Sequence, residues 1–536
     1  MLEHPYGGEA VYGDTQEPPT QNSFLPGGDN FIVSIVGQGY AAGVQEISGY
    51  TLELIPELVT ELPTAANGGV VANDDGTMTV NYTIKDEAVW ADGTPITGDD
   101  FQFTLDTIMN EDYPIVRTNY EDITATDVGE KTFSFTLSQP TVVFEFMFGE
   151  ILPKHDIEGT DFVNDYNDTR WVSNGPFSFQ EWAKGEYIIL ERNDNYWKTD
   201  EETGQQLPYL DTVQFRFIGE TAALINAFKA RELDVINPDP NTENIETLQA
   251  LEPEGAAVEV LNGPVWEHVA FQFADSRFER NENSCNESYD MRLAVAQAID
   301  RTVITDEILA GQVEPLGSYV DAFSPTLSQE QWDQYTFDPA AAAESYAAAV
   351  ADTGKECATV FTTTSNNDAR VTLSELFVDM FAAAGIPYTN DLEDSQLFFG
   401  ETFDGALWDL GEWAWVGSPG LAGLVSIHDV WDPESPLPDG DNVYSWGVPG
   451  SSEEGSEATT RYAAVRDEMN ATVDEAVIVP LIEEAEQILA DNLVFIPLYA
   501  RLVTGAVWAD EIGNFKMNPT QAGADWNLEY WYRTDS

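Results

Sequence analysis

Net charge is the property that most limits what this chain can fold into and bind. The 536 residues carry 95 Asp and Glu against 22 Lys and Arg, a formal net charge of −73. On a folded surface of ~19,000 Å², that is roughly one net negative charge per 260 Å². Such a surface repels phosphate backbones and anionic lipid headgroups, so neither nucleic acid nor an electrostatically held membrane surface is expected as a partner.

The rest of the composition favours packed cores. Apolar residues make up 43% of the chain and aromatic residues 12%, too much for a chain that is disordered throughout. The length predicts roughly two to four lobes rather than one compact core. The acidity indicates adaptation to a salty medium, because salt screens the repulsion between surface charges. An acidic extracellular protein in ordinary salt is the alternative that the sequence leaves open.

Residues 1–29 are interpreted as an acidic linker rich in Pro and Gly. They lack the basic and apolar segments of an intact secretory signal. They follow a removed signal, a removed lipid anchor or an artificial chain end, and the sequence does not decide between these. No run of about 18 apolar residues predicts a membrane span. Cys285 and Cys357 are permitted, but not required, to form a disulfide in an exported protein.

Hydrophobic patterns along the chain predict an α/β protein. A capping box at Thr97 and Asp100 predicts the start of a helix that buries Phe101. Pro339 marks the start of one further helix and Gly385 the end of another. Strands are predicted at 31–36, 77–84, 132–137, 187–191, 213–218, 233–236, 266–273, 359–364 and 493–499. The other helices are predicted at 220–231, 290–308, 339–350, 371–384, 461–469 and 479–490.

Motifs for covalent or metal chemistry are missing. The four histidines lie far apart in sequence and lack the H-E-x-x-H spacing of a zinc site. The chain has no G-x-S-x-G elbow and no phosphate-binding G-x-x-x-x-G-K-[ST] loop. Chance pairs of carboxylates are inevitable among 95 acids, so a secreted glycoside-acting enzyme stays open as a remote alternative. We expect no catalytic residue, no metal ion and no cofactor.

Five segments, taken in order, carry a resemblance to a known family. The segment V-W-A-D-G-T-P-I-T-G-D-D-F-Q-F-T, from Val89 to Thr104, resembles the signature W-x-D-G-x-P-x-T-x-x-D-[VF]-x-[FY]-[ST] of the extracellular solute-binding proteins, family 5. These are the oligopeptide, dipeptide and nickel binders of ABC importers. The resemblance covers about Phe31 to Tyr532. The four further segments are N-G-P-F at 174–177 with R-N-D-N-Y-W at 192–197, L-D-T-V-Q-F at 210–215 with F-K-A-R-E-L-D at 228–234, M-R-L-A-V-A-Q-A-I-D-R at 291–301, and Q-I-L-A-D at 487–491 with F-I-P-L-Y at 495–499.

The resemblance implies an α/β fold of the periplasmic-binding-protein type, type II, cluster C. That fold has two lobes joined by two hinge crossings, with an extra α+β subdomain inserted into lobe I. Solute would bind in the cleft and close the lobes in a hinge motion. The implied boundaries are 30–44, 170–268 and 485–536 for lobe I, 45–169 for its insertion, 269–484 for lobe II, and 267–271 and 485–492 for the crossings.

One loop of lobe II departs from the pattern of the family's peptide binders. Peptide binders resemble W-x-x-D-Y-x-D-P there, and the first Asp receives the α-ammonium of the peptide. This chain has E-W-A-W-V-G-S-P at 412–419, so Trp415 or Val416 stands where that carboxylate would be. A buried ammonium without a counter-charge is costly. Either Glu412 or Asp409 replaces the missing carboxylate, or the solute places no α-ammonium here.

Aromatic side chains of the same segment are the main candidates for contact with the solute. In a cleft, indoles stack on sugar rings, on aromatic side chains or around a cation, although a Trp-rich segment is also typical of a core. His268, near a hinge, is interpreted as a structural residue. The candidate ligand-binding residues are Trp408, Glu412, Trp413 and Trp415 on lobe II, Gln38 and Tyr40 on lobe I, and Trp266 at a hinge.

The resemblance implies the substrate-binding component of an ABC-type importer. We expect a monomer that captures a small solute without covalent chemistry and delivers it to a permease and its ATPase. An oligopeptide-like solute is the first prediction, and an oligosaccharide or another uncharged organic solute is the alternative. A chemoreceptor-type or adhesive module without a permease stays open beside the glycoside-acting enzyme. The implied location is extracellular or periplasmic, with an anchor to the outer face of the cytoplasmic membrane through a processed N-terminus.

The charge gives a first testable prediction. The melting temperature should rise when salt increases from ~0.1 M to ~1 M, because the screening length falls from ~10 Å to ~3 Å. Scanning calorimetry in a series of NaCl concentrations measures this directly. An unchanged or lower melting temperature in high salt would contradict the interpretation of a salt-adapted protein.

Overall fold

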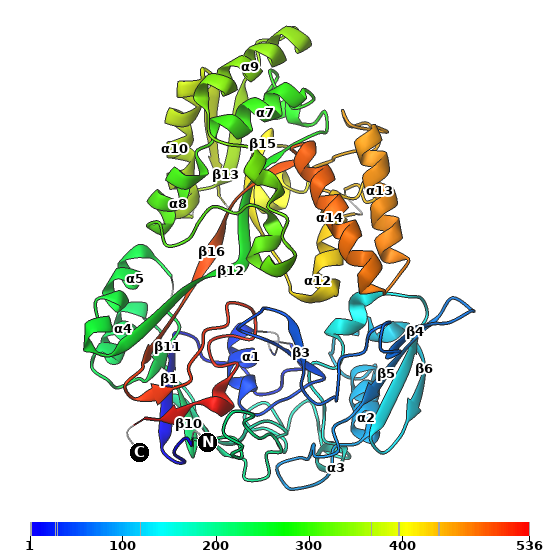
Figure 1. The fold of residues 1–536 in the computed structure, drawn as a ribbon, viewed down its shortest axis with the longest axis vertical. Helices are drawn as coiled ribbons and strands as arrows, with labels where there is room; N and C mark the ends of the chain where they lie inside the picture. The colour runs from blue at the N-terminus through cyan, green and yellow to red at the C-terminus, as the bar shows by residue number, and fades with distance from the viewer. Residues whose placement is uncertain are drawn as a thin grey trace. The chain divides into compact units, whose positions relative to one another are not determined.

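The computed structural model describes residues 3–26, 28, 30–117, 119–238, 240–365, 367–394, 397–437 and 440–534. Contacts within the chain divide it into two compact units. Unit 1 comprises Met1–Leu261 and Leu502–Ser536, and unit 2 comprises Asn262–Arg501. The chain passes from one unit to the other inside two long strands, β12 (Ala256–Phe271) and β16 (Phe495–Trp508) (Figure 1).

These divisions differ from the boundaries expected from the sequence. The expected second crossing, 485–492, falls on the end of helix α14 (Glu475–Asp491), which packs against α13 (Glu457–Asn470) inside unit 2. Helix α14 therefore belongs to unit 2, and the following strand, β16, forms the second crossing between the units. The separate subdomain at 45–169 stays a prediction.

Unit 1 is built on a mixed sheet whose centre is β1 (Glu9–Asp14). This strand is parallel to β10 (Thr212–Phe217) on one side and to β11 (Val235–Ile236) on the other. The interpretation of residues 1–29 as a linker is therefore wrong. Ala10 and Tyr12 are completely buried in the core. The short strand was hidden because its three apolar residues lie among acidic, Gly and Pro residues.

The segment after this strand is a second correction. Residues 31–36, predicted as a buried strand, belong to helix α1 (Phe31–Gln38). The Asn30 side chain caps the helix by accepting a hydrogen bond from the Ile32 amide at 3.2 Å. A short continuous apolar run fits a buried strand and a buried helix equally well. Here the Asn30 cap stabilises the start of a helix.

Most other predicted elements of unit 1 are confirmed. The capping box is present: the Asp100 carboxylate accepts a hydrogen bond from the Thr97 amide at 2.9 Å where α2 begins. The elements of unit 1 not yet given are β2 (Gln45–Ile47), β3 (Leu54–Pro56), β4 (Val70–Ala72), β5 (Met78–Thr83), α2 (Gly98–Ile108), β6 (Ile123–Val128), β7 (Thr132–Leu137), α3 (Lys154–Ile157), β8 (Phe177–Ala183), β9 (Tyr187–Arg192), α4 (Thr221–Lys229), α5 (Thr242–Gln249), β17 (Ile512–Gly513) and β18 (Tyr532–Arg533). Strands β4 to β7 form a separate antiparallel sheet.

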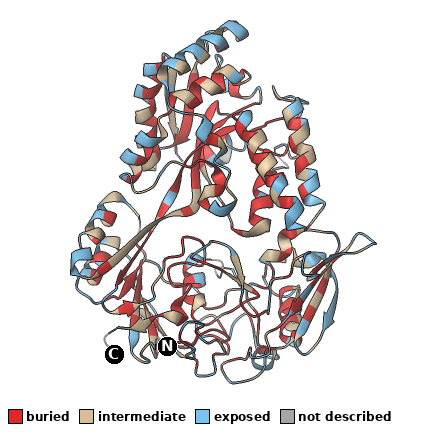
Figure 2. Cartoon of the chain, viewed as in Figure 1, coloured by how far each residue is buried: buried red, intermediate tan, exposed pale blue. Residues whose placement is uncertain are grey.

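Unit 2 carries a sheet with the order β14-β13-β15-β12-β16. Strand β13 (Thr359–Thr364) is parallel to both β14 (Tyr388–Glu393) and β15 (Leu410–Val416), whereas β12 is antiparallel to β15. The strands of this sheet are largely buried and the outward faces of the helices are exposed (Figure 2). Its helices are α6 (Arg277–Arg280), α7 (Tyr289–Ala298), α8 (Arg301–Leu309), α9 (Pro339–Thr353), α10 (Asp368–Ala384), α12 (Gly420–Ser426), α13 and α14.

One predicted helix of unit 2 is two helices in the structure. The pattern at 290–308 fits a single amphipathic helix, but α7 ends at Ala298 and α8 begins at Arg301. Asp300 separates them because its Oδ1 accepts hydrogen bonds from the Thr302 and Val303 amides, each at 3.2 Å. A side chain that caps the second helix ends the first.

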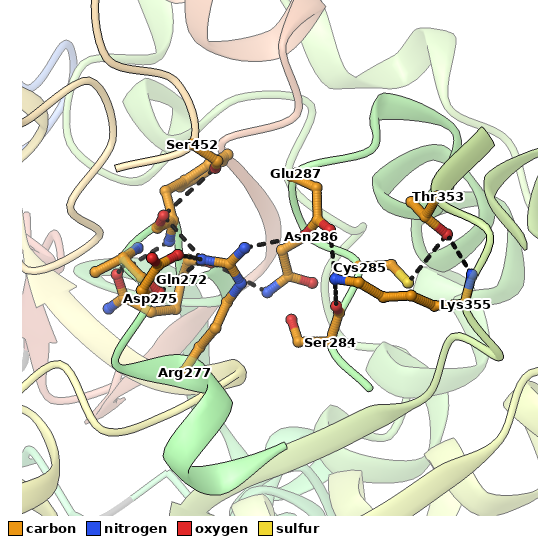
Figure 3. A network of polar contacts seen from close by, with 12 residues as sticks. Gln272, Asp275, Arg277, Ser284, Cys285, Asn286, Glu287, Thr353, Lys355 and Ser452 are labelled. Atoms are coloured by element: carbon orange, nitrogen blue, oxygen red, sulfur yellow. Dashed lines mark hydrogen bonds and ion pairs between the residues drawn. The ribbon is translucent and has the colours of Figure 1, made fainter. Parts of the chain in front are cut away.

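A disulfide joins Cys285 to Cys357, with 5.6 Å between the Cα atoms, which decides the question that the sequence left open. A polar network lies beside it (Figure 3). The buried Arg277 guanidinium donates to the main-chain oxygens of Phe273 and Ala274 and to Glu287. Lys355 donates to the same Glu287 carboxylate at 2.9 Å. Bridge and network together fix the segment before α7 to the segment after α9.

Replacing both cysteines with serine should lower the free energy of unfolding by about 4 kcal/mol, because the bridge spans 72 residues and restricts the unfolded chain. Urea unfolding of both forms, with and without a reductant, measures the effect. Reduction should weaken the wild-type protein by a similar amount and leave the double variant unchanged. A wild-type protein that does not respond to reduction would contradict a stabilising bridge.

Candidate functional site

The carboxyl edge of the parallel strands in unit 2 is where the topology favours a binding site. Strands β13 and β15 are parallel neighbours, and the chain goes from β13 to β14 on one side and from β15 to β16 on the other, so the connections from their carboxyl ends leave in opposite directions. In open α/β sheets, ligands bind at the point where the strand order reverses in this way. The end of β15, with Trp413, Trp415 and Val416, lies at this edge, and so does the start of α10.

The register of β12 and β15 separates the candidate residues onto two faces of the sheet. Trp415 lies opposite Trp266, and Trp413 lies opposite His268. Glu412, one position along, lies opposite Val269 on the other face. Because side chains alternate along a strand, the indoles and the Glu412 carboxyl cannot meet the same solute atom.

Three of the predicted tryptophans are core residues. Trp413 is 1% exposed, and its ring lies 5.1 Å from that of Trp408 and 4.8 Å from that of His268. Trp408 and Trp266 are completely buried. The large aromatic cluster around them stabilises unit 2 through apolar burial and edge-to-face contacts.

Trp415 differs from these three because it is half-buried. Its Nε1 donates a hydrogen bond to the Tyr444 hydroxyl at 2.9 Å. That hydroxyl also lies within hydrogen-bonding distance of His268 Nε2, at 2.6 Å. Burial lowers the pKa of His268 to about 3, which keeps the ring neutral and able to accept. The interpretation of His268 as a structural residue agrees with this arrangement.

Sequence reasoning missed two aromatic residues beside Trp415. Phe403 has its ring 6.2 Å from the Trp415 ring, and Phe399 lies 5.8 Å from Phe403 and is 42% exposed. Phe399 belongs to a π-helical turn, Phe398–Thr402, a geometry found often at functional sites. We call Phe399, Phe403 and Trp415 the aromatic patch. The signal in the sequence was the spacing of Phe399 and Phe403, which one turn brings together.

Neither acid proposed to replace the missing carboxylate lies with the aromatic patch. Asp409 is completely buried, and its Oδ2 accepts from the Val360 amide at 2.9 Å and from Asn281 Nδ2 at 2.6 Å. Burial raises the pKa of Asp409, and its hydrogen bonds oppose that rise. Glu412 is also completely buried, on the opposite face of the sheet. Both carboxyl groups are held inside unit 2.

In unit 1, the two residues predicted to bind the solute, Gln38 and Tyr40, have different surroundings. Tyr40 is 2% exposed, and its hydroxyl donates a hydrogen bond to Gln21 Oε1 at 3.0 Å. The Arg170 guanidinium lies over the Tyr40 ring, 4.5 Å from the centre of that ring. Burial lowers the pKa of Arg170 to about 10. Gln38 ends helix α1 and is half-buried. Gln38 is therefore better placed than Tyr40 to reach a solute.

Within the described part of the chain, no group of three or more His, Cys, Asp or Glu side chains is arranged to hold a metal ion. Among the described helices, none combines the length and the apolar character needed to cross a bilayer.

Comparison with known proteins agrees with the fold. A family model for bacterial extracellular solute-binding proteins, family 5 Middle, matches residues 53–426. A probable ABC transporter-binding protein of Deinococcus radiodurans is 24% identical over 363 residues, which cover 63% of this chain and 59% of that protein. The chain spans between half and three-fifths of the length of the first curated relatives that it matches.

Two solved structures show the same fold. The periplasmic EDTA-binding protein EppA is 18% identical, with a TM-score of 0.73 over 99% of this chain and 97% of that one. The oligopeptide-binding protein AppA of Bacillus subtilis, in complex with a nonapeptide, is 20% identical, with a TM-score of 0.60 over 99% of this chain and 100% of that one. The predicted α/β fold of the cluster C periplasmic binding proteins is confirmed.

The burial of the two tryptophans on β15 gives a prediction about stability. Trp413→Ala should lower the free energy of unfolding by about 3–5 kcal/mol, because it empties a packed core position. Trp415→Ala should cost about 1 kcal/mol, since that side chain is only half-buried. Urea unfolding of both variants measures the difference. Equal losses would show that Trp415 is a core residue too.

Proposed function

Because the chain belongs to the bacterial extracellular solute-binding proteins, family 5, we propose that it is the substrate-binding component of an ABC-type importer. The family consists of binding proteins and not of enzymes, which agrees with the absence of catalytic motifs from the sequence. In the proposed mechanism the two units close on a solute, and the closed form delivers it to a permease and its ATPase. Closure around a ligand is a hinge motion that needs no covalent step.

The proposed solute is oligopeptide-like and leaves its α-ammonium unbound in unit 2. The observation that carries this proposal is the aromatic patch, which lies at the carboxyl edge of β15 while Asp409 and Glu412 are held elsewhere. Exposed rings offer contact area to apolar side chains at low entropic cost. The name of AppA, an oligopeptide-binding protein solved with a nonapeptide, supports a peptide. EppA is named for EDTA, so proteins of this fold accept other solutes as well.

An oligosaccharide or another uncharged organic solute is the second candidate. The half-buried Trp415 favours it, because an indole face stacks on a sugar ring as readily as on an apolar side chain.

The proposed location is outside the cytoplasmic membrane. The family match supports an extracytoplasmic position, and an anchor through a processed N-terminus belongs to the proposal, as does the monomeric state. Adaptation to a salty medium is also proposed, on the net charge of −73 alone.

The experiment is thermal unfolding in ~1 M salt with matched panels of short peptides, N-acetylated peptides and short glucans. A solute at about 100 times its dissociation constant should add about 2.7 kcal/mol to stability. We expect free and acetylated peptides to raise the melting temperature equally, because neither Asp409 nor Glu412 lies with the patch.

Two variants test whether the patch carries the binding. Trp415→Ala should abolish the shift, whereas Trp182→Ala should keep it. Trp182 is the matched control: it is half-buried, it belongs to β8 in unit 1, and its Nε1 likewise makes one hydrogen bond, to Glu17 at 2.8 Å. A shift with glucans alone would overturn the peptide proposal. A shift that survives Trp415→Ala would overturn the site.

A further inference from the structure

The hydrogen bond of the Trp415 indole decides what the aromatic patch can offer to a solute. Trp415 Nε1 lies 2.9 Å from the Tyr444 hydroxyl. An indole nitrogen carries one hydrogen and accepts none, so the Tyr444 oxygen must be the acceptor, whichever nitrogen of His268 carries the proton. Tyr444 is completely buried, so a solute cannot replace it without opening the core. The single polar atom of the Trp415 side chain is therefore already bound inside unit 2.

The other two members of the patch have no polar side-chain atoms. Phe399 is 42% exposed, its ring lies 5.8 Å from that of Phe403, and the Phe403 ring lies 6.2 Å from that of Trp415. With the indole nitrogen bound to Tyr444, the side chains of the patch present only carbon and π surface. A sugar needs partners for its hydroxyl groups besides a ring to stack on, because a hydroxyl buried without a hydrogen bond is costly. The contact with Tyr444 therefore weighs against the oligosaccharide candidate.

Two acids of the paired strands lie on the other face of the sheet, together with two arginines. Glu267 accepts hydrogen bonds from Arg501 Nε at 2.8 Å and from Arg370 Nη2 at 3.1 Å. Glu412 faces the same way, and Arg370 Nε lies 3.5 Å from its carboxyl oxygen. Because side chains alternate along a strand, the sheet itself separates these groups from Trp415. Neither acid supplies the patch with an ionic partner for a cation.

Tyr444 is itself fixed by three contacts, and this fixes the indole that it binds. Its hydroxyl lies 2.6 Å from His268 Nε2, its main-chain oxygen accepts from the Phe273 amide at 3.0 Å, and its ring lies 5.5 Å from that of Trp413. Burial raises the pKa of Tyr444, so the hydroxyl keeps its hydrogen at neutral pH and adds no negative charge beside the patch. Tyr444 is therefore a neutral acceptor in a fixed position.

From these contacts, and resting on the proposed function, we propose that Tyr444 is a positioning residue that sets specificity: by binding the indole N–H of Trp415, it makes the aromatic patch a subsite for an aromatic side chain of the peptide. The ring planes of Phe399 and Phe403 are inclined by 61°, and those of Phe403 and Trp415 by 60°. Inclined rings set the edge of one ring toward the face of the next, and a ring from the solute continues that arrangement. Tyr444 does not touch the solute and acts through Trp415.

The experiment uses five-residue alanine peptides in which one residue is Phe, Leu, Ser or Lys, at each position in turn. Titration calorimetry in ~1 M salt gives the dissociation constants. At the most responsive position, we expect the Phe peptide to bind about tenfold more tightly than the Ser peptide, because burial of an aromatic side chain is favourable. The Leu peptide should bind about threefold more weakly than the Phe peptide, because it lacks the ring contact. A Leu, Ser or Lys peptide that binds as tightly as the Phe peptide overturns the proposal.

Tyr444→Phe keeps the buried ring and removes the acceptor. The freed indole N–H then offers a donor to a serine hydroxyl, and the indole loses its fixed position, so the preference for Phe over Ser should fall to about twofold. Tyr462→Phe is the matched control, because Tyr462 is also completely buried in unit 2 and its hydroxyl lies 2.8 Å from His428 Nδ1. The control should lose a similar amount of stability and keep the preference. A preference that survives Tyr444→Phe, or that both variants lose equally, contradicts the assigned role.

A measurement without any importer solute separates this inference from the proposed function. The Trp415 indole N–H resonance in NMR spectra, assigned by its loss in Trp415→Phe, should exchange slowly with water in the wild-type protein and faster in Tyr444→Phe. Millimolar N-acetyl-phenylalanine amide should shift this resonance, whereas the serine analogue and methyl glucoside should not. These fragments also decide on the wild-type protein alone, should Tyr444→Phe fail to fold.

The two failures are distinguishable. If no peptide and no glucan binds, the importer proposal fails, while a shift caused by the phenylalanine fragment alone still supports the aromatic subsite. If that shift is absent, or if all three fragments cause it equally, the inference fails whatever the solute. Fast exchange of the indole N–H in the wild-type protein would likewise exclude Tyr444 as its acceptor.

Discussion

The pairing of β12 with β15 is the constraint on which the organisation of unit 2 depends. A slip by one residue would turn Trp413 and Trp415 to the face of the two arginines and would bring Glu412 among apolar rings. Both outcomes are costly, since the first leaves Arg370 without its carboxylates and the second buries an acid without a partner. The register is therefore fixed from both faces, and the separation of the aromatic patch from the acids is a direct result.

Four of the few cations of the chain are buried in its interior. Arg170, Arg277, Arg292 and Arg370 have side chains that are 1%, 2%, 3% and 5% exposed, and each forms an ion pair with a glutamate. Such pairs are strongly destabilising to break, because the partner is left as a buried charge. The whole chain has only 22 Lys and Arg. Because these four arginines lie inside, the surface carries a greater excess of negative charge than it would if the Lys and Arg residues were distributed uniformly.

The sequence predicted the elements whose signals are local, and the misses have physical causes. The capping box at Thr97 gave the start of α2, and alternation gave β5, β7 and β13. Residues 31–36 were misassigned because a short apolar run has no period that separates strand from helix. The strand at 9–14 was missed because burial by neighbouring strands, and not its own composition, makes it central.

For the candidate site the sequence gave the segment but not the exposure of its members. The family resemblance directed attention to the tryptophans of β15, yet only the folded structure shows that Trp413 is buried while Trp415 is half-buried. Phe403 joins them through a π-helical turn, a geometry that no hydrophobic period announces. Glu412 was one candidate to receive an ammonium, and the pairing of β12 with β15 places it, fully buried, on the face of the sheet opposite to the tryptophans.

Salt acts on the surface charges of this molecule far more strongly than on its buried ion pairs. Mobile ions screen exposed charges within a length of ~3 Å at ~1 M salt, but they do not enter a packed sheet. The repulsion among surface carboxylates therefore fades with salt, whereas the buried ion pair between Arg370 and Glu267 is shielded from it. A protein held folded by concentrated salt would keep this ion pair unchanged, since it lies where the surrounding ions cannot reach.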